Sequence, residues 1–225
     1  MRIEVKELKK DICFQNQKIS ILKDVNMSFE SGQIVTIVGE SGSGKSTLLN
    51  IMSLLDDCTS GEYRWDDKDI FSLKKSEKQE FLAKYAGVVF QQYNLINNMT
   101  CYENVKVPLY LNRNVKCSER QGIVENMLES VGLSHRKDHF PKTLSGGEQQ
   151  RAAIARALVN DPEVIFADEP TGNVDSENEK QILNLFRKIS DRGKIVVIVT
   201  HSEVVKGFSD KVYRISDGVT RMETA

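Results

Sequence analysis

The chain has 225 residues, enough for one large domain or for one domain with a small inserted lobe. Apolar residues make up 40% and charged residues 28%, which fits a globular core and excludes a collagen-like or wholly disordered chain. The 31 basic and 32 acidic residues leave a net charge of −1, so binding to nucleic acid through a basic surface is not expected.

Predicted strands dominate the first third of the chain. Residues 2–8 alternate charged and apolar side chains, residues 19–29 form a second strand candidate, and residues 33–38 form a short apolar strand between two glycines. A helix is predicted over residues 44–55, because leucine and methionine recur there at helical spacing. Residues 62–70 are predicted to form a hairpin that turns at an Asp-Asp-Lys sequence.

The middle of the chain, from about residue 95 to residue 160, has mostly helical signals. Ser118 and Gln121 match a capping box, and Gly132 is a stop signal for the helix that they would begin. A second helix is predicted over residues 145–159.

Strands and helices alternate again in the last third. Residues 164–167 and 194–200 are apolar enough to be buried strands, and between them Ser176 and Glu179 are predicted to cap a helix. A hairpin turned at Asp217-Gly218 is predicted near the end of the chain. This order predicts an α/β domain that is interrupted by an α-helical lobe.

Neither a membrane span nor a targeting segment is expected. The aliphatic runs 34–38 and 195–199 have five residues each, whereas a membrane-spanning helix needs about 20. The N-terminus lacks the apolar stretch of a signal peptide. The four cysteines are widely scattered, which argues against a disulfide framework or a zinc site. We therefore expect a cytoplasmic protein.

A glycine-rich sequence between a predicted strand and a predicted helix matches G-x-x-x-x-G-K-[ST] at every position. Glycines let the backbone N–H groups turn inward toward phosphate oxygens, and the helix N-terminus adds positive partial charge. Lys45 is expected to reach the β- and γ-phosphates, and the Ser46 hydroxyl is expected to bind Mg²⁺. A mere connecting loop is the alternative. The predicted phosphate-binding residues are Gly39, Glu40, Ser41, Gly42, Ser43, Gly44, Lys45, Ser46 and Thr47.

This motif does not by itself separate ATPases from GTPases or small-molecule kinases. Guanine specificity normally requires N-K-x-D and a GTPase switch normally requires D-x-x-G, and neither string occurs in the sequence. A GTPase is therefore not expected.

The predicted strand 164–167 ends in two carboxylates, Asp168 and Glu169. In a parallel sheet the carboxyl end of such a strand opens toward the same crevice as the glycine-rich loop. Asp168 could hold Mg²⁺ there through its water shell, and Glu169 could polarise a water that attacks the γ-phosphate. The alternative is that two acidic residues simply end a buried strand.

The segment Leu144–Gln149, LSGGEQ, lies between these two motifs. Alone it could be an ordinary helix start, since serine is a good N-cap residue. In this position it resembles the signature motif of the ABC (ATP-binding cassette) ATPases. Three more residues fit the family's order, because Gln91 resembles the Q-loop glutamine, Asp175 falls in the D-loop and His201 resembles the switch histidine.

The resemblance spans nearly the whole chain and implies the ABC ATPase fold. That fold is an α/β P-loop NTPase (RecA-like) core with an N-terminal antiparallel β subdomain and an inserted α-helical subdomain. It implies a single domain over residues 1–225, with the core at about 1–90 and 160–225 and the helical subdomain at about 95–158. It also implies hydrolysis of ATP, with ATP and Mg²⁺ as cofactors.

In this family two subunits meet head to tail, and the signature residues of one close over the ATP of the other. Ser145 and the glycines after it would offer a hydroxyl, N–H groups and a positive helix end to the phosphate. His201 would contact the γ-phosphate and help to orient Glu169 or the attacking water, and Gln91 would sense Mg²⁺.

The resemblance therefore implies three sets of site residues. The catalytic set is Lys45, Gln91, Glu169 and His201. The nucleotide-binding set outside the glycine-rich loop is Phe14, as an aromatic that stacks on adenine, with Ser145, Gly146, Gly147, Glu148 and Asp175. The magnesium set is Ser46, Gln91 and Asp168.

The string ADEPTGNVD at residues 167–175 resembles a subgroup of the family, the LolD-, MacB-, FtsE- and BceA-like ATPases. QQYNL at 91–95 and ENVKVPL at 103–109 are also similar to that group, and Val174 departs from its usual leucine. The likeness implies a homodimer, an FtsX/MacB-like integral membrane permease as partner and a peripheral position on the inner face of the membrane. Residues 93–107 are the expected face for the permease's coupling helix, and a simple solvated surface is the alternative.

Two other functions fit the motifs less well. A soluble ABC-family ATPase that acts on ribosomes or DNA usually carries two cassettes or long coiled-coil insertions, and neither is visible in the sequence. A P-loop small-molecule kinase would leave residues 145–147 without a role. The sequence therefore favours the ATPase subunit of an ABC transporter, with no nucleic-acid partner.

Overall fold

The computed structural model describes residues 1–15, 17–112 and 114–223. The strands are β1 (Arg2–Phe14), β2 (Gln17–Glu30), β3 (Ile34–Val38), β4 (Ser60–Trp65), β5 (Lys68–Asp69), β6 (Ala86–Val89), β7 (Val164–Asp168), β8 (Ile195–Val199), β9 (Lys211–Ser216) and β10 (Val219–Glu223). The helices are α1 (Lys45–Met52), α2 (Lys75–Tyr85), α3 (Cys101–Lys106), α4 (Cys117–Ser130), α5 (Gly146–Leu158), α6 (Ser176–Ser190) and α7 (Glu203–Gly207), and the 3₁₀ helices are η1 (Val107–Tyr110), η2 (Ser134–Arg136) and η3 (Pro141–Thr143).

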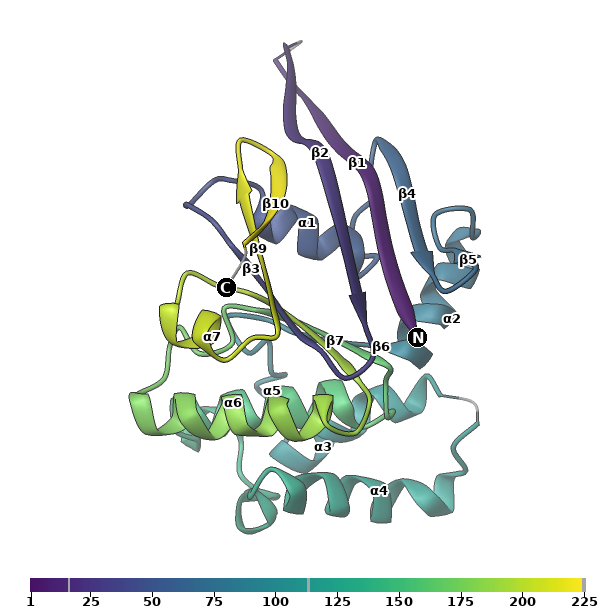
Figure 1. The fold of residues 1–225 in the computed structure, drawn as a ribbon. Helices are drawn as coiled ribbons and strands as arrows, with labels where there is room; N and C mark the ends of the chain where they lie inside the picture. The colour runs from purple at the N-terminus through teal and green to yellow at the C-terminus, as the bar shows by residue number, and fades with distance from the viewer. Residues whose placement is uncertain (16, 113, 224–225) are drawn as a thin grey trace.

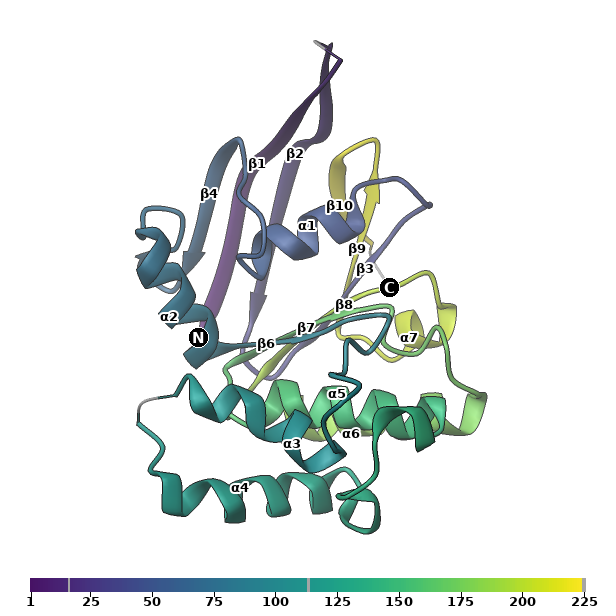
Figure 2. The ribbon, with the colours of Figure 1, turned by 180° about the vertical axis from the view of Figure 1, so that it is seen from behind.

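The strands form one sheet in the order β5-β4-β1-β2-β10-β9-β3-β8-β7-β6. Strands β6, β7, β8 and β3 are parallel to one another, whereas β5, β4, β1 and β2 pair antiparallel. Figure 1 shows the long β1–β2 hairpin projecting beyond the rest of the protein, and Figure 2 shows the same from behind. The parallel strands form the part of the sheet that positions the site.

Both faces of the parallel strands are covered, which is why these strands are apolar at nearly every position. Val35 and Ile37 of β3 pack in one cluster with Leu48 of α1 and with the antiparallel strands. Ile34 and its neighbours on β8 pack in a second cluster with α5 and with Phe186 of α6. Helices α1 and α5 therefore lie on opposite faces of the sheet, as Figures 1 and 2 show.

Helices α3, α4 and α5 surround a third buried cluster, which lies on the side of α5 away from the sheet (Figure 2). Within the described residues, no helix is both long enough and apolar enough to cross a bilayer. The helical interpretation of the middle of the chain is confirmed, including the helix that Ser145 begins.

Two predicted elements differ from the structure at their ends, and one helix was not predicted. The first strand continues to Phe14, because register shifts between Val5 and Asp11 interrupt the alternation that marks a strand in the sequence. Helix α1 ends at Met52 rather than at residue 55, since Leu54 adopts a left-handed backbone with φ of 58°. Helix α2 was not predicted, and only Phe81 of its side chains is buried, so its sequence carries almost no helical periodicity.

Two predicted caps were also wrong. At the start of α4, the backbone amide of Lys116 donates to the carboxylate of Glu119 (3.2 Å). This bond takes the place of the predicted capping box of Ser118 and Gln121. Asp175, not Ser176, caps α6. Both predictions chose a residue one or two positions too late, because adjacent polar residues compete for the cap. The turn at Asp217-Gly218 is confirmed, with both residues at positive φ.

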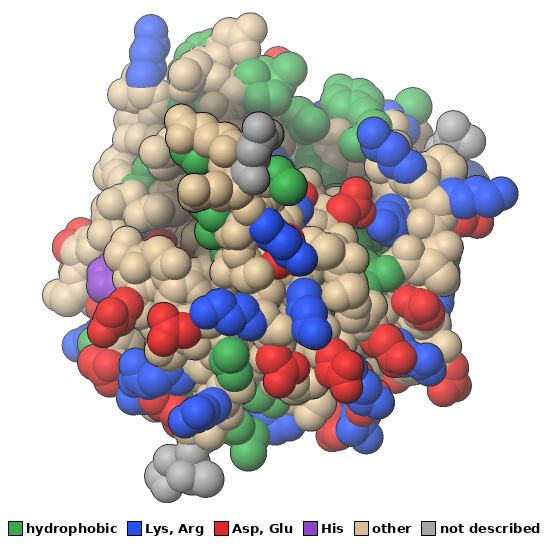
Figure 3. All heavy atoms as spheres, turned by 90° about the horizontal axis from the view of Figure 1, so that it is seen from above, with side chains coloured by type: hydrophobic (Ala, Val, Ile, Leu, Met, Phe, Trp, Pro, Cys, Tyr) green, Lys and Arg blue, Asp and Glu red, His purple; other side chains and the backbone are tan. Residues whose placement is uncertain are grey.

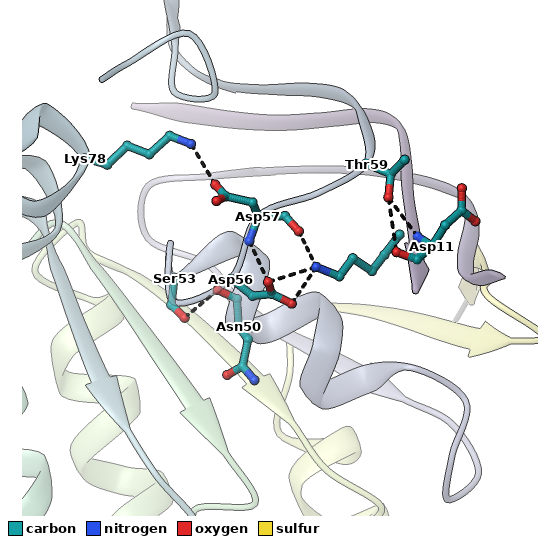
Figure 4. A network of polar contacts seen from close by, with 8 residues as sticks. Asp11, Asn50, Ser53, Asp56, Asp57, Thr59 and Lys78 are labelled. Carbon is teal, nitrogen blue, oxygen red and sulfur yellow. Dashed lines mark hydrogen bonds and ion pairs between the residues drawn. The ribbon is translucent and has the colours of Figure 1, made fainter. Parts of the chain in front are cut away.

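A network of ion pairs ties the base of the β1–β2 hairpin to the end of α1 and to α2 (Figure 4). The Nζ of Lys10 donates to Asp56 Oδ1 (2.8 Å) and to the carbonyl of Asp57 (2.6 Å). Lys78 of α2 donates to Asp57 Oδ1 (2.9 Å), and the backbone amide of Asp11 donates to Thr59 Oγ1 (2.8 Å). These contacts hold the segment that follows α1, the helix that begins in the glycine-rich loop.

Candidate active site

The glycine-rich loop Gly39–Ser46, called the phosphate loop below, connects β3 to α1. Gly42 and Gly44 adopt φ of 80° and 101°, a backbone region that favours glycine. At Gly39 a Cβ would lie 2.4 Å from the carbonyl oxygen of Ile215, so only glycine fits there. The loop can therefore bend tightly and direct its N–H groups toward an anion at the start of α1.

Lys45 folds back over the loop that precedes it. Its Nζ donates to the carbonyl oxygens of Gly39 and Glu40, both at 2.8 Å. These bonds hold the ammonium group beside the loop, where it can neutralise a phosphate.

The strand order brings three parts of the predicted site, a loop and two residues, to one edge of the sheet. Strand β8 lies between β3 and β7, and Val199 of β8 pairs with both Ile37 and Asp168. Because the three strands are parallel, the phosphate loop, Asp168 and His201 all follow strand ends at the same edge.

Ser46 and Asp168 make a pair of oxygen donors. Burial raises the pKa of Asp168, and the negative charge of Glu169 raises this pKa further. A hydrogen bond from the Ser46 hydroxyl and the positive charge of Lys45 oppose the rise. Among the described residues there is no cluster of three or more His, Cys, Asp or Glu side chains able to hold a metal. A hydroxyl and one carboxylate fit Mg²⁺, which is usually held by one or two side chains together with substrate phosphates.

Glu169 accepts a hydrogen bond at each carboxylate oxygen. His201 Nδ1 lies 2.8 Å from Oε1, and Thr200 Oγ1 lies 2.8 Å from Oε2. The Glu169 side chain is 12% exposed and that of His201 is 75% exposed. The backbone of Glu169 is left-handed, with φ of 43°, an uncommon conformation for a residue with a side chain. A carboxylate held in this way is suited to accept a proton from a water molecule.

Gln91 is exposed just after β6, and its backbone is anchored from two sides. Asn173 Nδ2 donates to the Gln91 carbonyl oxygen (3.2 Å). Arg156 of α5 donates to the carbonyl oxygens of Tyr93 (2.8 Å) and Asn94 (2.5 Å), two and three residues further along the chain. The turn that carries Gln91 is thus fastened to α5 and to the segment after β7. Neither Arg156 nor Thr200 was predicted from the sequence, because their partners are distant in the chain.

The signature residues form the N-terminus of α5. Ser145 Oγ accepts from the amide of Glu148 (3.3 Å), and the Ser145 amide donates to Glu148 Oε2 (2.8 Å). The Glu148 amide donates to a lone pair of the Ser145 hydroxyl, so the hydroxyl hydrogen is still able to donate to an anion. At Gly147 a Cβ would lie 2.2 Å from Asn178 Oδ1, so glycine lets α5 approach α6.

Asp175 caps α6. Its Oδ1 accepts from the amides of Glu177 (3.0 Å) and Asn178 (2.9 Å), and the bond from Asn178 is the largest cause of its lowered pKa. Within the described residues, no hydrogen bond joins the phosphate loop to Ser145–Glu148 or to Asp175. One chain therefore carries two separate groups of site residues.

Phe14 lies at the tip of the β1–β2 hairpin, where it pairs with Gln17. Its side chain is 60% exposed. The hairpin tip stands apart from α1 in Figures 1 and 2, so stacking of Phe14 on a base stays a prediction.

The Glu148→Gln variant is expected to lose less than about 1 kcal/mol of stability at pH 7. Glutamine keeps the bond to the Ser145 amide but loses the ion pair with Arg136 (2.8 Å). Burial alone would raise the pKa of Glu148, but the bonds from Ser145 and Arg136 outweigh it and lower the pKa. The wild-type protein is therefore more stable than the variant at pH values above the pKa of Glu148 in the unfolded chain, about 4.3. This difference in stability is lost as pH falls through the lower pKa of Glu148 in the folded protein.

Thermal melts of the nucleotide-free protein between pH 7 and pH 3 would measure this difference. Glu119→Gln is the matched control, since Glu119 makes the same contact at the start of α4. An advantage of the wild-type protein that grows as pH falls would contradict the expected sign.

Comparison with known proteins identifies the family. Residues 22–172 match the ABC transporter family. An uncharacterised ABC transporter ATP-binding protein of Methanocaldococcus jannaschii is 41% identical over 216 residues, 96% of each chain. The ABC transporter ATP-binding protein YtrE of Bacillus subtilis is 42% identical over 208 residues, 92% of this chain and 90% of YtrE. The macrolide export ATP-binding/permease protein MacB of Bdellovibrio bacteriovorus is 38% identical over 221 residues, 98% of this chain but 34% of MacB.

Solved structures agree with this assignment. The dimeric post-hydrolysis state of the ATP-binding cassette MJ0796, bound to ADP and Pi, is 38% identical and superimposes with a TM-score of 0.91, covering 99% of this chain and 98% of that one. A further dimeric structure of MJ0796, a bacterial ABC transporter cassette, has the same TM-score at 39% identity. The α/β fold described above is thus that of the ABC ATPases. The chain belongs to the ABC transporter family, as one of its ATP-binding, ATP-hydrolysing subunits.

Proposed function

We propose that this subunit dimerises around MgATP and drives conformational change in an integral membrane permease of the MacB, LolD or FtsX type. The proposal locates it at the inner face of the cell membrane, bound through that permease. The observation that carries it is the division of the site, because α1 and α5 pack on opposite faces of the sheet. A head-to-tail pair of chains would bring the two groups of residues together. The dimeric cassettes that resemble this chain support such a pair.

The first group of residues would perform the chemistry. Lys45 would bind phosphate oxygens beside the loop. Ser46, Asp168 and Gln91 would hold Mg²⁺, which when bound neutralises charge on the phosphates. Glu169 would take the proton of the attacking water.

The second group would close the site from the other chain. The hydroxyl of Ser145 and the N–H groups of Gly146 and Gly147 stand at the start of a helix of 13 residues. They would bind the γ-phosphate held by the partner copy, with the helix dipole adding to the attraction. Hydrolysis would remove that shared ligand and loosen the pair.

A hollow of about 1160 Å³ is the proposed docking site for the permease. It lies among α2, β6, η1 and α5. Of residues 93–107, the face expected from the sequence, only Asn94 lines it. Leu55 and Leu111 line it with side chains that are 49% and 72% exposed. Exposed apolar side chains beside a hollow are typical of a surface that receives another protein. Arg156 and Asn94 both line the hollow, and Arg156 donates to the Asn94 carbonyl. This bond would connect a docked permease to the turn that carries Gln91.

The Leu111→Asp variant is expected to lose capture of the permease while it keeps the basal rate of ATP hydrolysis. A charge at this rim would have to be desolvated when a partner docks. Tagged chain would be incubated with detergent-solubilised membranes that contain a MacB- or FtsX-type permease, and bound membrane protein would be measured. Met222→Asp, at another exposed apolar residue, on β10, is the control. Equal capture by wild-type and Leu111→Asp chains would contradict the docking site.

Action on ribosomes or DNA gains no support from the face shown in Figure 3. On the face shown in Figure 3, Lys and Arg side chains are interleaved with Asp and Glu side chains instead of forming one basic area. Retention of ribosomes rather than a membrane protein in the same capture experiment would overturn the proposed function.

A further inference from the structure

Thr200, between β8 and His201, has a buried side chain that faces a single charged group. The residue is 1% exposed, and its backbone amide donates to the carbonyl of Ile37 (3.1 Å), which fixes it to the sheet. Its Oγ1 lies 2.8 Å from Glu169 Oε2 and 3.0 Å from the backbone amide of Ser202.

These two neighbours determine the direction of the hydrogen bond. The amide of Ser202 can only donate, so Thr200 Oγ1 must accept from it. The threonine hydrogen is then directed to the carboxylate of Glu169, which accepts it. Hydrogen bonds to an ionised acceptor are shorter and stronger than neutral ones.

The loop that supplies the Ser202 amide is itself held. Ser202 Oγ donates to Glu179 Oε1 of α6 (3.3 Å), and Thr171 Oγ1 donates to the same oxygen (3.1 Å). Glu179 thereby joins the loop after β8 to the turn after β7. The hydroxyl of Thr200 is fixed by this arrangement and cannot rotate away without losing a bond.

We propose that Thr200 is a positioning residue that holds the Glu169 carboxylate in its catalytic orientation, an inference that rests on the proposed role of Glu169 as the group that accepts the proton of water. His201 holds the other oxygen, but its side chain is 75% exposed and can turn toward a phosphate. Thr200 is buried and stays in place when His201 turns. Each carboxylate oxygen keeps a second lone pair, which leaves room for a water molecule.

The backbone of Glu169 is also held in place. With φ of 43°, the residue is held in an uncommon conformation by its surroundings, including the bond from its amide to the carbonyl of Val199 (2.8 Å). A misplacement of the carboxylate by about 1 Å can lower the rate by about 10²-fold.

The test compares variants of the full chain in steady-state hydrolysis of MgATP. Thr200→Val keeps the shape of the side chain without its hydroxyl, and we expect kcat to fall about tenfold or more with KM within about twofold of the wild-type value. Thr200→Ser restores the hydroxyl and should recover most of kcat. Thr220→Val is the matched control, since it removes a hydroxyl from a buried threonine of β10 that bonds only to the backbone amide (2.9 Å) and carbonyl (3.0 Å) of Asn26.

A double-mutant cycle separates positioning from general damage. In the Glu169→Gln background Thr200→Val should cause no further loss, because the group that it positions has been removed. A wild-type kcat for Thr200→Val, a failure of Thr200→Ser to recover activity, or an equal loss in Thr220→Val would overturn the inference. If Thr200→Val does not fold, as judged by thermal melting, Thr200→Ala takes its place in the same comparison.

The same series distinguishes this inference from the proposed function. Slow hydrolysis by Glu169→Gln together with a normal rate for Thr200→Val would reject only the role of Thr200. A normal rate for Glu169→Gln would reject the proposed role of Glu169 itself.

Discussion

Replacement of Glu169 by glutamine is expected to slow ATP hydrolysis by about 100-fold or more while ATP binding stays intact. The amide has nearly the same volume as the carboxylate and can still accept the bond from Thr200. It cannot take a proton from water, and it removes one negative charge next to Asp168. Phosphate release under single-turnover conditions would measure the rate, and titration with fluorescent ATP would measure the affinity.

The same variant should accumulate as a dimer in MgATP, visible as a doubled mass in size-exclusion chromatography. Slow hydrolysis leaves the nucleotide in place between the two chains. Glu163→Gln is the matched control, because Glu163 precedes the opposite end of β7 and pairs with Lys194 (3.3 Å) at the surface. Wild-type turnover by Glu169→Gln would remove Glu169 from its proposed role.

Replacement of Lys45 by alanine is expected to weaken ATP binding by about 10- to 100-fold, the scale of a lost hydrogen bond to a charged group. The variant loses the ammonium that would face the phosphates. It also loses the bonds from Nζ to the carbonyls of Gly39 and Glu40, which hold the side chain across the loop. Calorimetric titration with MgATP would measure the affinity directly.

Lys188→Ala, which removes an exposed lysine from α6, controls for the change in net charge. Thermal melts without nucleotide would separate a loosened loop from a lost phosphate contact, since only the former lowers the melting temperature. Unchanged affinity in Lys45→Ala would contradict the assignment of the phosphate loop.

The parts of the fold that could be predicted from the sequence are those with local causes. Strands β3, β7 and β8 are buried on both faces, so they stand out as continuous apolar runs, and the glycines of the phosphate loop are required by its backbone. Helix α2 is different because it buries only Phe81, so nothing periodic marks it. The end of β1 was hidden by register shifts, which a sequence does not reveal.

The site was predictable to the extent that it follows known motifs, and unpredictable where it depends on pairing between distant strands. The position of β8 between β3 and β7 brings Thr200 to Glu169, 31 residues away in the chain. Arg156 reaches the carbonyl of Asn94 across 62 residues. A threonine after an apolar strand or an arginine on a helix has no local feature that marks such a contact. Side chains of this kind are found only once the sheet order is known.

The placement of α1 and α5 on opposite faces of one sheet has a consequence for how defects are inherited. In the proposed dimer each nucleotide would touch residues from both chains, so an altered copy would impair a site that belongs to its intact neighbour. A chain altered only in its phosphate loop and a chain altered only at Ser145–Gly147 would then form a pair that keeps one intact site, built from the unaltered element of each. Two such defects would accordingly complement each other when both chains are made in one cell.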